Sequence, residues 1–183
     1  MPGPRHEGWQ RPLPVQRRSG DLTDMRKLIE LTHVTLGEEV GSPQEWVAPY
    51  LDDQHMEYSS SLLGEAEVLL LGRVTYEGLS TAYTAMRPNA FVDRMNAIPK
   101  YVASRTLQEA RWNATLIKGD VVSFVTDLKQ ENGGSILRYG NGALTQTLME
   151  HGFIDEFHFL LTPVAVGKGK HLPVRRCVHD DHR

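Results

Sequence analysis

The chain has 183 residues, of which 40% are hydrophobic and 23% are charged, enough for one globular domain with a sizeable core. Its net charge of −3 does not favour a nucleic-acid or anionic membrane partner, and no apolar run approaches the roughly 20 residues of a membrane span. The single cysteine, Cys177, excludes an internal disulfide, and no secretory signal is evident, so we expect a cytoplasmic protein.

The two ends of the chain differ in composition from the middle. Residues 1–24 are rich in Pro, Gly and Arg, which predicts a disordered extension: either Met25 is the natural start, or the segment is a flexible arm. Residues 173–183 form a polar tail without a strand pattern, which we interpret as a truncated C-terminus. Its two histidines, His179 and His182, lack a third ligand, so we expect no metal site. The domain is therefore predicted over residues 25–172.

Within that domain, strands alternate with helices. Hydrophobic periodicity predicts strands over residues 26–36, 67–71, 100–103, 115–117, 135–139 and 155–166. Helices are predicted over residues 51–66, 75–79, 90–98, 121–130 and 143–149. Thr75 is the predicted N-cap of the second helix, and Asp120 is the predicted N-cap of the fourth. This order predicts an α/β fold with a largely parallel sheet and helices on both faces.

Three of the predicted strands end in residues that suit an anion. The ends are Gly72-Arg73-Val74-Thr75, Ser104-Arg105-Thr106 and Gly140-Asn141-Gly142. Ligands of such sheets bind beyond the carboxyl ends of the strands, and a helix N-terminus offers free N–H groups and a positive dipole end to a phosphate. The alternative for the Gly140–Gly142 turn is a plain turn that uses glycine for a positive φ.

Four stretches then occur together in an informative order: MRKLIELTHVTL (25–36), LLLGRVTYEGL (69–79), KYVASRTL (100–107) and ILRYGNGALTQTLMEHGFIDEFHFLLTPVAVGKGKHL (136–172). In this combination the chain resembles the dihydrofolate reductase-like family of the riboflavin-biosynthesis reductase type, the RibD C-terminal domain family. The resemblance implies a three-layer α/β/α domain with a mixed, mostly parallel sheet, and NADPH as the hydride donor.

The resemblance also implies which residues bind the cofactor. Gly72, Arg73 and Thr75 match the turn at the pyrophosphate, and Ser104 and Arg105 match the pair at the adenosine 2′-phosphate. Gly140, Asn141, Gly142 and Ala143 match the glycine turn and helix start at the phosphates. Arginine forms paired, charge-assisted bonds with phosphate, so Arg73 and Arg105 favour NADPH over NADH, unless both are ordinary solvated side chains.

The reduction also needs a proton and a bound substrate. Asp53 and Glu57, on the helix after the first loop, are candidate proton donors; the alternatives are a solvated helix face, with a water or the substrate itself as the proton source. His33 and Thr162 are candidate substrate contacts, and the alternative for His33, which the strand pattern favours, is a core histidine.

Two departures from the family pattern affect these expectations. Relatives usually have Leu-Asp-Gly after the first strand, whereas this chain has Leu36-Gly37-Glu38-Glu39. Without the two further strands that the family usually has, the strand over 155–166 would present an unpaired edge. We therefore expect either a poorly stable domain or a homodimer formed through that edge.

The leading hypothesis is an NADPH-dependent reductase of a small heterocycle, either 5-amino-6-(5-phosphoribosylamino)uracil or a pterin-like compound. An alternative is a non-catalytic relative that binds NADPH or another nucleotide and has a degenerate substrate side. A weaker third hypothesis is a phosphosugar or nucleotide binder without redox chemistry, which would not prefer NADPH over NADH.

Overall fold

The computed structural model describes residues 25–172, so the predicted extension, the polar tail and Cys177, His179 and His182 lie outside the described residues. Six strands form one sheet in the order β4-β3-β2-β5-β1-β6. The strands are β1 (Leu28–Thr35), β2 (Ala66–Gly72), β3 (Lys100–Ala103), β4 (Ala114–Leu116), β5 (Ser135–Tyr139) and β6 (Glu156–Thr162).

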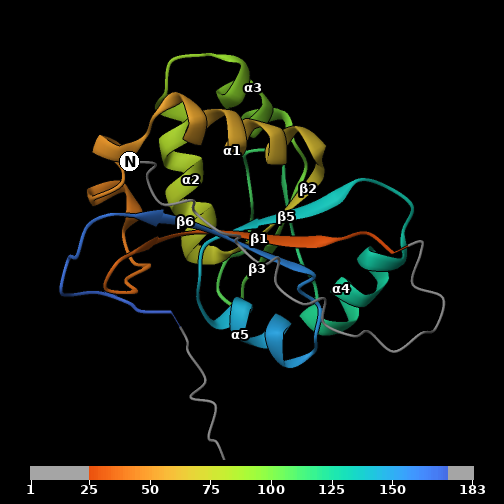
Figure 1. The fold of residues 1–183 in the computed structure, drawn as a ribbon. Coiled ribbons are helices and arrows are strands. Elements are labelled where there is room, and N and C mark those ends of the chain that lie inside the picture. Colours follow the sequence, from red (N-terminus) through yellow and green to blue (C-terminus); the bar gives the residue numbers. More distant parts are fainter. Residues whose placement is uncertain (1–24, 173–183) are drawn as a thin grey trace, which may run out of the picture.

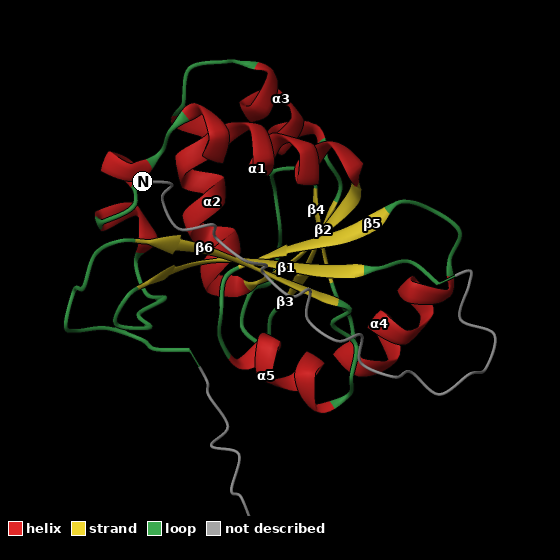
Figure 2. Ribbon diagram, in the orientation of Figure 1, coloured by secondary structure: helices red, strands yellow, loops and turns green. Residues whose placement is uncertain are grey.

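Helices cover both faces of this sheet. One face is covered by α1 (Asp53–Glu65), α2 (Arg73–Ala85) and α3 (Ala90–Ala97), and the other by α4 (Val121–Gln130) and α5 (Ala143–Glu150), as Figures 1 and 2 show. Two short 3-10 helices, η1 (Pro43–Glu45) and η2 (Ala48–Tyr50), lie in the loop after β1. The predicted three-layer α/β fold is confirmed.

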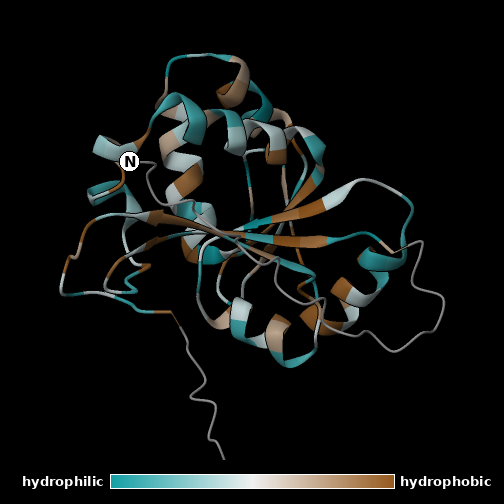
Figure 3. Ribbon diagram, viewed as in Figure 1, coloured by the Kyte–Doolittle hydropathy of each residue, from teal (hydrophilic) through white to brown (hydrophobic). Residues whose placement is uncertain are grey.

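The described strands pair in parallel throughout. Antiparallel pairing within residues 25–172 is limited to one isolated bridge, between Glu39 and His171. Parallel strands covered on both faces must be apolar on both sides, and β2 shows this, because Val68 through Leu71 are all buried. Leu69 and Leu71 pack toward α1–α3 and Val68 and Leu70 toward α4 and α5, so hydrophobic colour runs along the central strands in Figure 3.

Two predicted boundaries are wrong for identifiable reasons. Thr75 is not an N-cap, because α2 begins at Arg73 with Gly72 in the N-cap position, so Thr75 is the third residue of the helix. The last strand ends at Thr162 rather than Val166, where the next residue, Pro163, has no N–H to continue a ladder. The Asp120 N-cap is confirmed, since its carboxylate accepts the Ser123 N–H at 2.8 Å.

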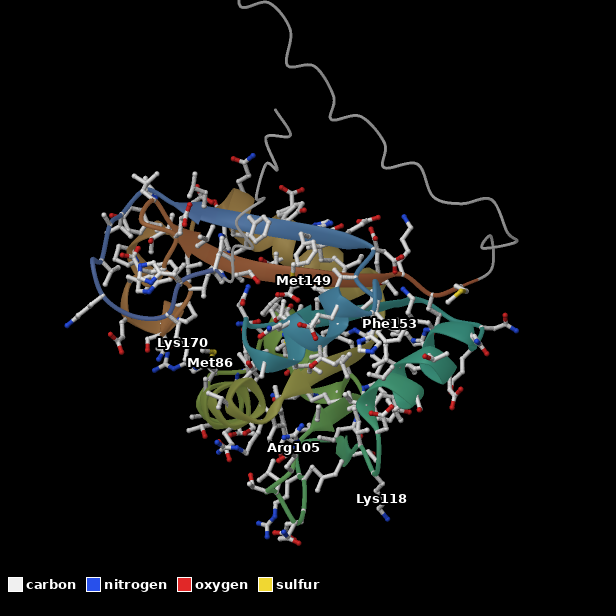
Figure 4. All side chains as sticks on the ribbon, turned by 90° about the horizontal axis from the view of Figure 1, so that it is seen from below. Met86, Arg105, Lys118, Met149, Phe153 and Lys170 are labelled. Atoms are coloured by element: carbon white, nitrogen blue, oxygen red, sulfur yellow. The ribbon has the colours of Figure 1, made fainter. Side chains whose placement is uncertain are left out.

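β6 lies at one edge of the sheet. Within residues 25–172 it pairs only with β1, as expected for an exposed edge. Phe157, Phe159 and Leu161 alternate on one side of β6 and are exposed. In the view from the α4–α5 side, β6 lies beside α5, and no described helix covers the face of β6 that is turned to the viewer (Figure 4). This strand therefore leaves apolar side chains in contact with solvent.

Candidate functional site

Two of the five helices begin differently from the others. Helices α1, α3 and α4 start at Asp52, Asn89 and Asp120, and each of these side chains accepts a backbone N–H of the first helical turn. Helices α2 and α5 instead start at Gly72 and Gly142 and receive no side-chain cap. Their first-turn N–H groups therefore remain available to an anion, together with the positive ends of both helix dipoles.

These two glycine starts lie side by side, because β2 and β5 are neighbours in the sheet. A Cβ added at Gly72 would lie 4.0 Å from Leu144 Cβ, so the start of α2 faces the first turn of α5. A Cβ added at Gly140 would lie 3.2 Å from Thr75 Cγ2 and closer still to its hydroxyl, and Gly140 also has φ +84°. Only glycine therefore fits at position 140. These contacts show that the structure brings together two of the three predicted strand ends, at Gly72 and at Gly140.

Gly142 differs from Gly140. Its backbone is extended at φ 179°, and an added Cβ would meet no atom within 4 Å. Gly142 and Ala143 are both exposed. The space above the start of α5 is therefore open, as a bound phosphate group would require.

A buried polar network supports this turn from below, and the sequence analysis did not identify it. Thr145, in the first turn of α5, accepts the Gly142 N–H at 3.2 Å and donates to Glu30 Oε1 at 3.2 Å. Arg138 donates to the same hydroxyl and pairs with Glu30 through Nε and Oε2 at 2.8 Å. All three side chains are almost inaccessible, and burial raises the pKa of Glu30 although Arg138 opposes that shift.

The signal for this network was present in the sequence. Glu30 interrupts the apolar stretch Leu28–Leu31, and Arg138 interrupts Ile136–Tyr139. A charged residue in the middle of a strand that is buried on both faces requires a partner, because an unpaired buried charge is very costly. The two residues are also adjacent in register, since Glu30 pairs with Arg138 across the β1–β5 ladder.

The two predicted arginines lie on the surface near these turns. Arg73 Nη1 pairs with Glu77 at 2.9 Å across one helical turn, which makes Glu77 a structural partner. Arg105 is exposed in the loop after β3 (Figure 4) and forms no ion pair within residues 25–172. Ser104 organises that loop, because its hydroxyl accepts the N–H groups of Thr106 and Leu107 at 3.2 and 3.0 Å. These bonds of Ser104 fix the backbone on both sides of Arg105, while its guanidinium stays free to pair with an anion.

The predicted substrate residues lie on the α1 side of the sheet. Asp53 and Glu57 are exposed on α1, whereas His55 between them turns toward β1. The rings of His55 and His33 stack with centroids 5.0 Å apart and planes 12° apart. Burial and the neighbouring His55 lower the pKa of His33 to about 4, and burial also lowers the pKa of His55. Thr162 is buried at the end of β6, opposite Thr35 of β1.

The loop that departs from the family pattern is organised by Glu39. Its buried carboxylate accepts the Thr35 hydroxyl and the Gly167 N–H, the latter at 2.7 Å. These bonds, led by that of Thr35, hold the pKa of Glu39 below its usual value. The loop after β1 is thereby tied to the loop after β6, and backbone bonds from Val40 to Lys170 and from Leu172 to Glu38 extend the contact.

Residues 25–172 offer neither a metal-binding cluster nor a membrane-spanning helix. That region holds no cluster of three or more His, Cys, Asp or Glu side chains arranged to bind a metal ion. None of its helices combines the length and apolar character needed to span a membrane.

Comparison with known proteins relates this geometry to a family. The family model of the RibD C-terminal domain matches residues 38–176. The uncharacterized protein YyaP of Bacillus subtilis (strain 168) is 29% identical over 118 residues, and the match covers 62% of each chain. The chain thus spans less than two thirds of that relative.

Solved structures share the fold. A Shewanella sp. PV-4 protein provisionally assigned to riboflavin biosynthesis aligns with a TM-score of 0.59 at 19% identity, over 81% of this chain and 86% of its own. Schistosoma mansoni dihydrofolate reductase aligns at 0.53 and 16% identity, over 82% and 81% of the two chains. Enterococcus faecalis dihydrofolate reductase, complexed with NADP(H) and RAB-propyl, aligns with a TM-score of 0.53 at 14% identity, over 80% of this chain and 76% of its own.

Proposed function

Because the chain belongs to the RibD C-terminal domain family, we propose that it is an NADPH-dependent reductase of a small heterocyclic substrate. The observation that supports this most directly is the pair of adjacent, uncapped helix starts at Gly72 and Gly142. Two helix N-termini side by side suit the two charged groups of a pyrophosphate. NADPH would supply the hydride, and the protein would supply position and electrostatics.

Each cofactor residue has a role that its chemistry supports. The N–H groups at Arg73 and Ala143 would bind the pyrophosphate, with Thr75 and Asn141 beside them. Gly140 allows the turn to pack against α2, and Gly142 leaves room for the phosphate. Arg105 and Ser104 would hold the 2′-phosphate, because a guanidinium without another partner can form paired bonds with it.

The substrate side is proposed to lie where α1 faces β1 and β6. A pterin-like ring or 5-amino-6-(5-phosphoribosylamino)uracil would contact His33 and Thr162 there. Asp53 or Glu57, at the exposed side of α1, could pass a proton to the substrate through water as the hydride arrives. We further propose a cytoplasmic homodimer that pairs through the exposed edge of β6.

One observation favours a second candidate, a non-catalytic nucleotide-binding relative. The loop after β1 is closed onto the loop after β6 by Glu39 and Gly167, at the position where the family pattern differs. A loop fixed in this way could limit access to the substrate side. NADPH binding without turnover of pterins or aminouracils would support this candidate over the reductase.

The decisive experiment is a titration of the purified protein with NADPH and, separately, with NADH. We expect NADPH to bind at least about tenfold more tightly, because the 2′-phosphate adds charge-assisted bonds. Arg105→Ala should remove most of that preference while leaving NADH binding unchanged. Arg111→Ala is the matched control, since Arg111 is an exposed arginine of the same loop that pairs with Glu109. Equal affinities for the two nucleotides would overturn the assignment and favour the non-redox nucleotide binder.

A further inference from the structure

Four side chains form a continuous hydrogen-bonded series between α1 and β6. The hydroxyl of Tyr58 on α1 lies 2.5 Å from Nδ1 of His158 on β6, and the two rings stack with centroids 6.0 Å apart. Nε2 of His158 lies 3.0 Å from Glu156 Oε2, and the other oxygen of Glu156 accepts from Lys27 Nζ at 2.9 Å. The series therefore joins a phenol, an imidazole and a carboxylate, with the phenol on α1.

Tyr58 lies on the side of α1 that faces the proposed substrate position. It follows His55 by three residues, which places both side chains on one face of the helix, and His55 stacks on His33. His158 pairs in register with the uncharged Leu31, two residues before His33, so it lies on the same face of the sheet as His33. Tyr58 is 41% exposed, so a ligand can reach it.

The two acidic candidates on the same helix are oriented differently. Asp53 and Glu57 are exposed, and Glu57, which directly precedes Tyr58, is rotated from it by about 100° around the helix axis. A proton donor must come within about 3 Å of the accepting atom or act through a water. Tyr58 can therefore meet a ligand between α1 and the sheet directly, whereas Asp53 and Glu57 would need a water.

The partners of His158 determine where its protons lie. The bonds from Lys27 and from His158 lower the pKa of Glu156, and an ionised carboxylate only accepts, so Nε2 of His158 carries a proton toward Glu156. In the neutral imidazole, Nδ1 then accepts the Tyr58 hydroxyl. In the imidazolium, Nδ1 donates to the Tyr58 oxygen and leaves the hydroxyl proton to point elsewhere. The second state offers the phenol proton to a ligand.

Tyr58 is better suited to donate a proton than the neighbouring imidazoles are. Burial and then the negative charge of Glu156 raise the pKa of Tyr58, so the phenol keeps its proton until an acceptor takes it. Burial, with His55 adding to it, lowers the pKa of His33 to about 4. Burial also lowers the pKa of His55, although the charge of Asp52 opposes that shift. Both imidazoles are therefore uncharged near neutral pH and are poor proton sources.

We propose that Tyr58 is the catalytic proton donor of the reductase and that His158, held by Glu156, is the positioning residue that resupplies its proton. This inference rests on the proposed function, since it names the proton donor of the same site. As the carbon of a substrate C=N bond accepts the hydride of NADPH, the nitrogen takes the hydroxyl proton of Tyr58, and the phenol oxygen takes the Nδ1 proton of the His158 imidazolium. NADPH is thereby oxidised to NADP⁺, the C=N bond is reduced to an amine, and neutral His158 recovers a proton from water.

NADPH oxidation with 7,8-dihydropterin and, separately, with 5-amino-6-(5-phosphoribosylamino)uracil tests the donor between about pH 6 and 9. We expect Tyr58→Phe to lower kcat by about 100-fold with little change in KM, because a general acid acts in the transition state. Wild-type kcat should decline as the pH rises through the range in which an imidazole titrates. His158→Gln can still bond Tyr58 but cannot resupply a proton, so it should lose that decline. Tyr50→Phe is the matched control, since Tyr50 lies on η2 and is also 41% exposed.

A measurement on the protein without NADPH tests the hydrogen bonds themselves. By NMR of the ring nitrogens of His158, Nε2 should stay protonated, and Nδ1 should shift in Tyr58→Phe and on addition of 7,8-dihydropterin, but not in Tyr50→Phe. An Nδ1 resonance that Tyr58→Phe leaves in place, or turnover that Tyr58→Phe does not slow, would overturn the proposal while the reductase assignment stands. If neither probe drives NADPH oxidation by the wild-type protein, the proposed function fails, and the proton donor with it.

Discussion

The network beneath the glycine turn can be tested with Thr145→Val, which removes one buried hydroxyl and keeps the side-chain volume. That hydroxyl accepts the Gly142 N–H at 3.2 Å, accepts from Arg138, and donates to Glu30. In the variant, one oxygen of Glu30 and one N–H of Arg138 lose a buried partner, and the Gly142 N–H at the surface loses its acceptor. Leaving buried polar groups unpaired costs about 1–3 kcal/mol each, so we expect a loss of about 2–3 kcal/mol in the free energy of unfolding.

The matched control is Thr147→Val, two residues further along α5. Among residues 25–172, the Thr147 hydroxyl bonds only the Ala143 carbonyl of its own helix, at 3.2 Å, on the exposed side. We expect this variant to stay within about 0.5 kcal/mol of the wild type. Urea unfolding measures both values, and an unchanged m-value would show that the change lies in stability alone.

The same variant tests whether the network prepares the binding site. If Thr145 fixes the Gly140–Gly142 turn, Thr145→Val should weaken NADPH binding by about tenfold through the cost of reordering the turn, while Thr147→Val leaves it unchanged. Equal stability and equal NADPH affinity of the two variants would refute this role of Thr145. A loss of stability without a loss of affinity would limit the role of the network to folding.

Three further predictions follow from other sites. Gly140→Ala should destabilise the fold because φ is +84° and α2 leaves no space, whereas Gly142→Ala should retain stability by thermal melting and lose NADPH affinity in titration. Burial, with Arg94 nearby, lowers the pKa of Lys100 from 10.5 to about 8 in the folded protein. Between these two pH values the unfolded protein therefore binds more protons at Lys100 than the folded protein does. Wild-type stability should therefore rise by about 1 kcal/mol per pH unit above pH 8 relative to Lys100→Met, and parallel pH profiles would contradict this. Phe159→Lys on β6 should dissociate the proposed homodimer, as measured by light scattering. Met86→Lys, at another exposed apolar position, should leave the dimer intact. A wild-type protein that is monomeric would refute pairing through the edge of β6.

Local signals in the sequence determined how much of this fold could be predicted. The alternation of strands and helices, the Asp120 cap and the Gly140–Gly142 break each depend on neighbouring residues, and all three were found. The predicted start of α2 was wrong because the N-cap residue, Gly72, has no side chain that marks it as a cap. Thr75 is a residue type typical of caps but lies inside the helix. A cap motif identifies only those helix starts whose first N–H groups are bonded by a side chain. Helix starts whose N–H groups are left to bind a ligand are therefore missed by this motif.

Long-range pairings were beyond such signals. Glu30 and Arg138 are 108 positions apart, and His33 and His55 meet only because α1 returns over β1. Each of the four residues could be recognised as unusual in its segment, but none revealed its partner. The direction in which Asp53, His55 and Glu57 point also depends on how α1 is rotated against the sheet, which its weak apolar periodicity does not define.

β1 connects the two halves of the proposed site through the alternation of its side chains. Glu30 points toward α5 and supports the phosphate turn, whereas His33, three residues later, points toward α1 and the substrate side. An odd spacing is required for this, because residues an even number apart lie on the same face of a strand. A shift of one residue in the β1–β5 register would send Glu30 toward α1 and His33 toward α5. It would remove the partner of Arg138 and the proposed substrate contact at once. The buried Glu30–Arg138 pair opposes such a shift, because only the observed register satisfies both charges. The ion pair beneath the Gly140–Gly142 turn therefore also fixes the face of β1 on which His33, the proposed substrate contact, lies.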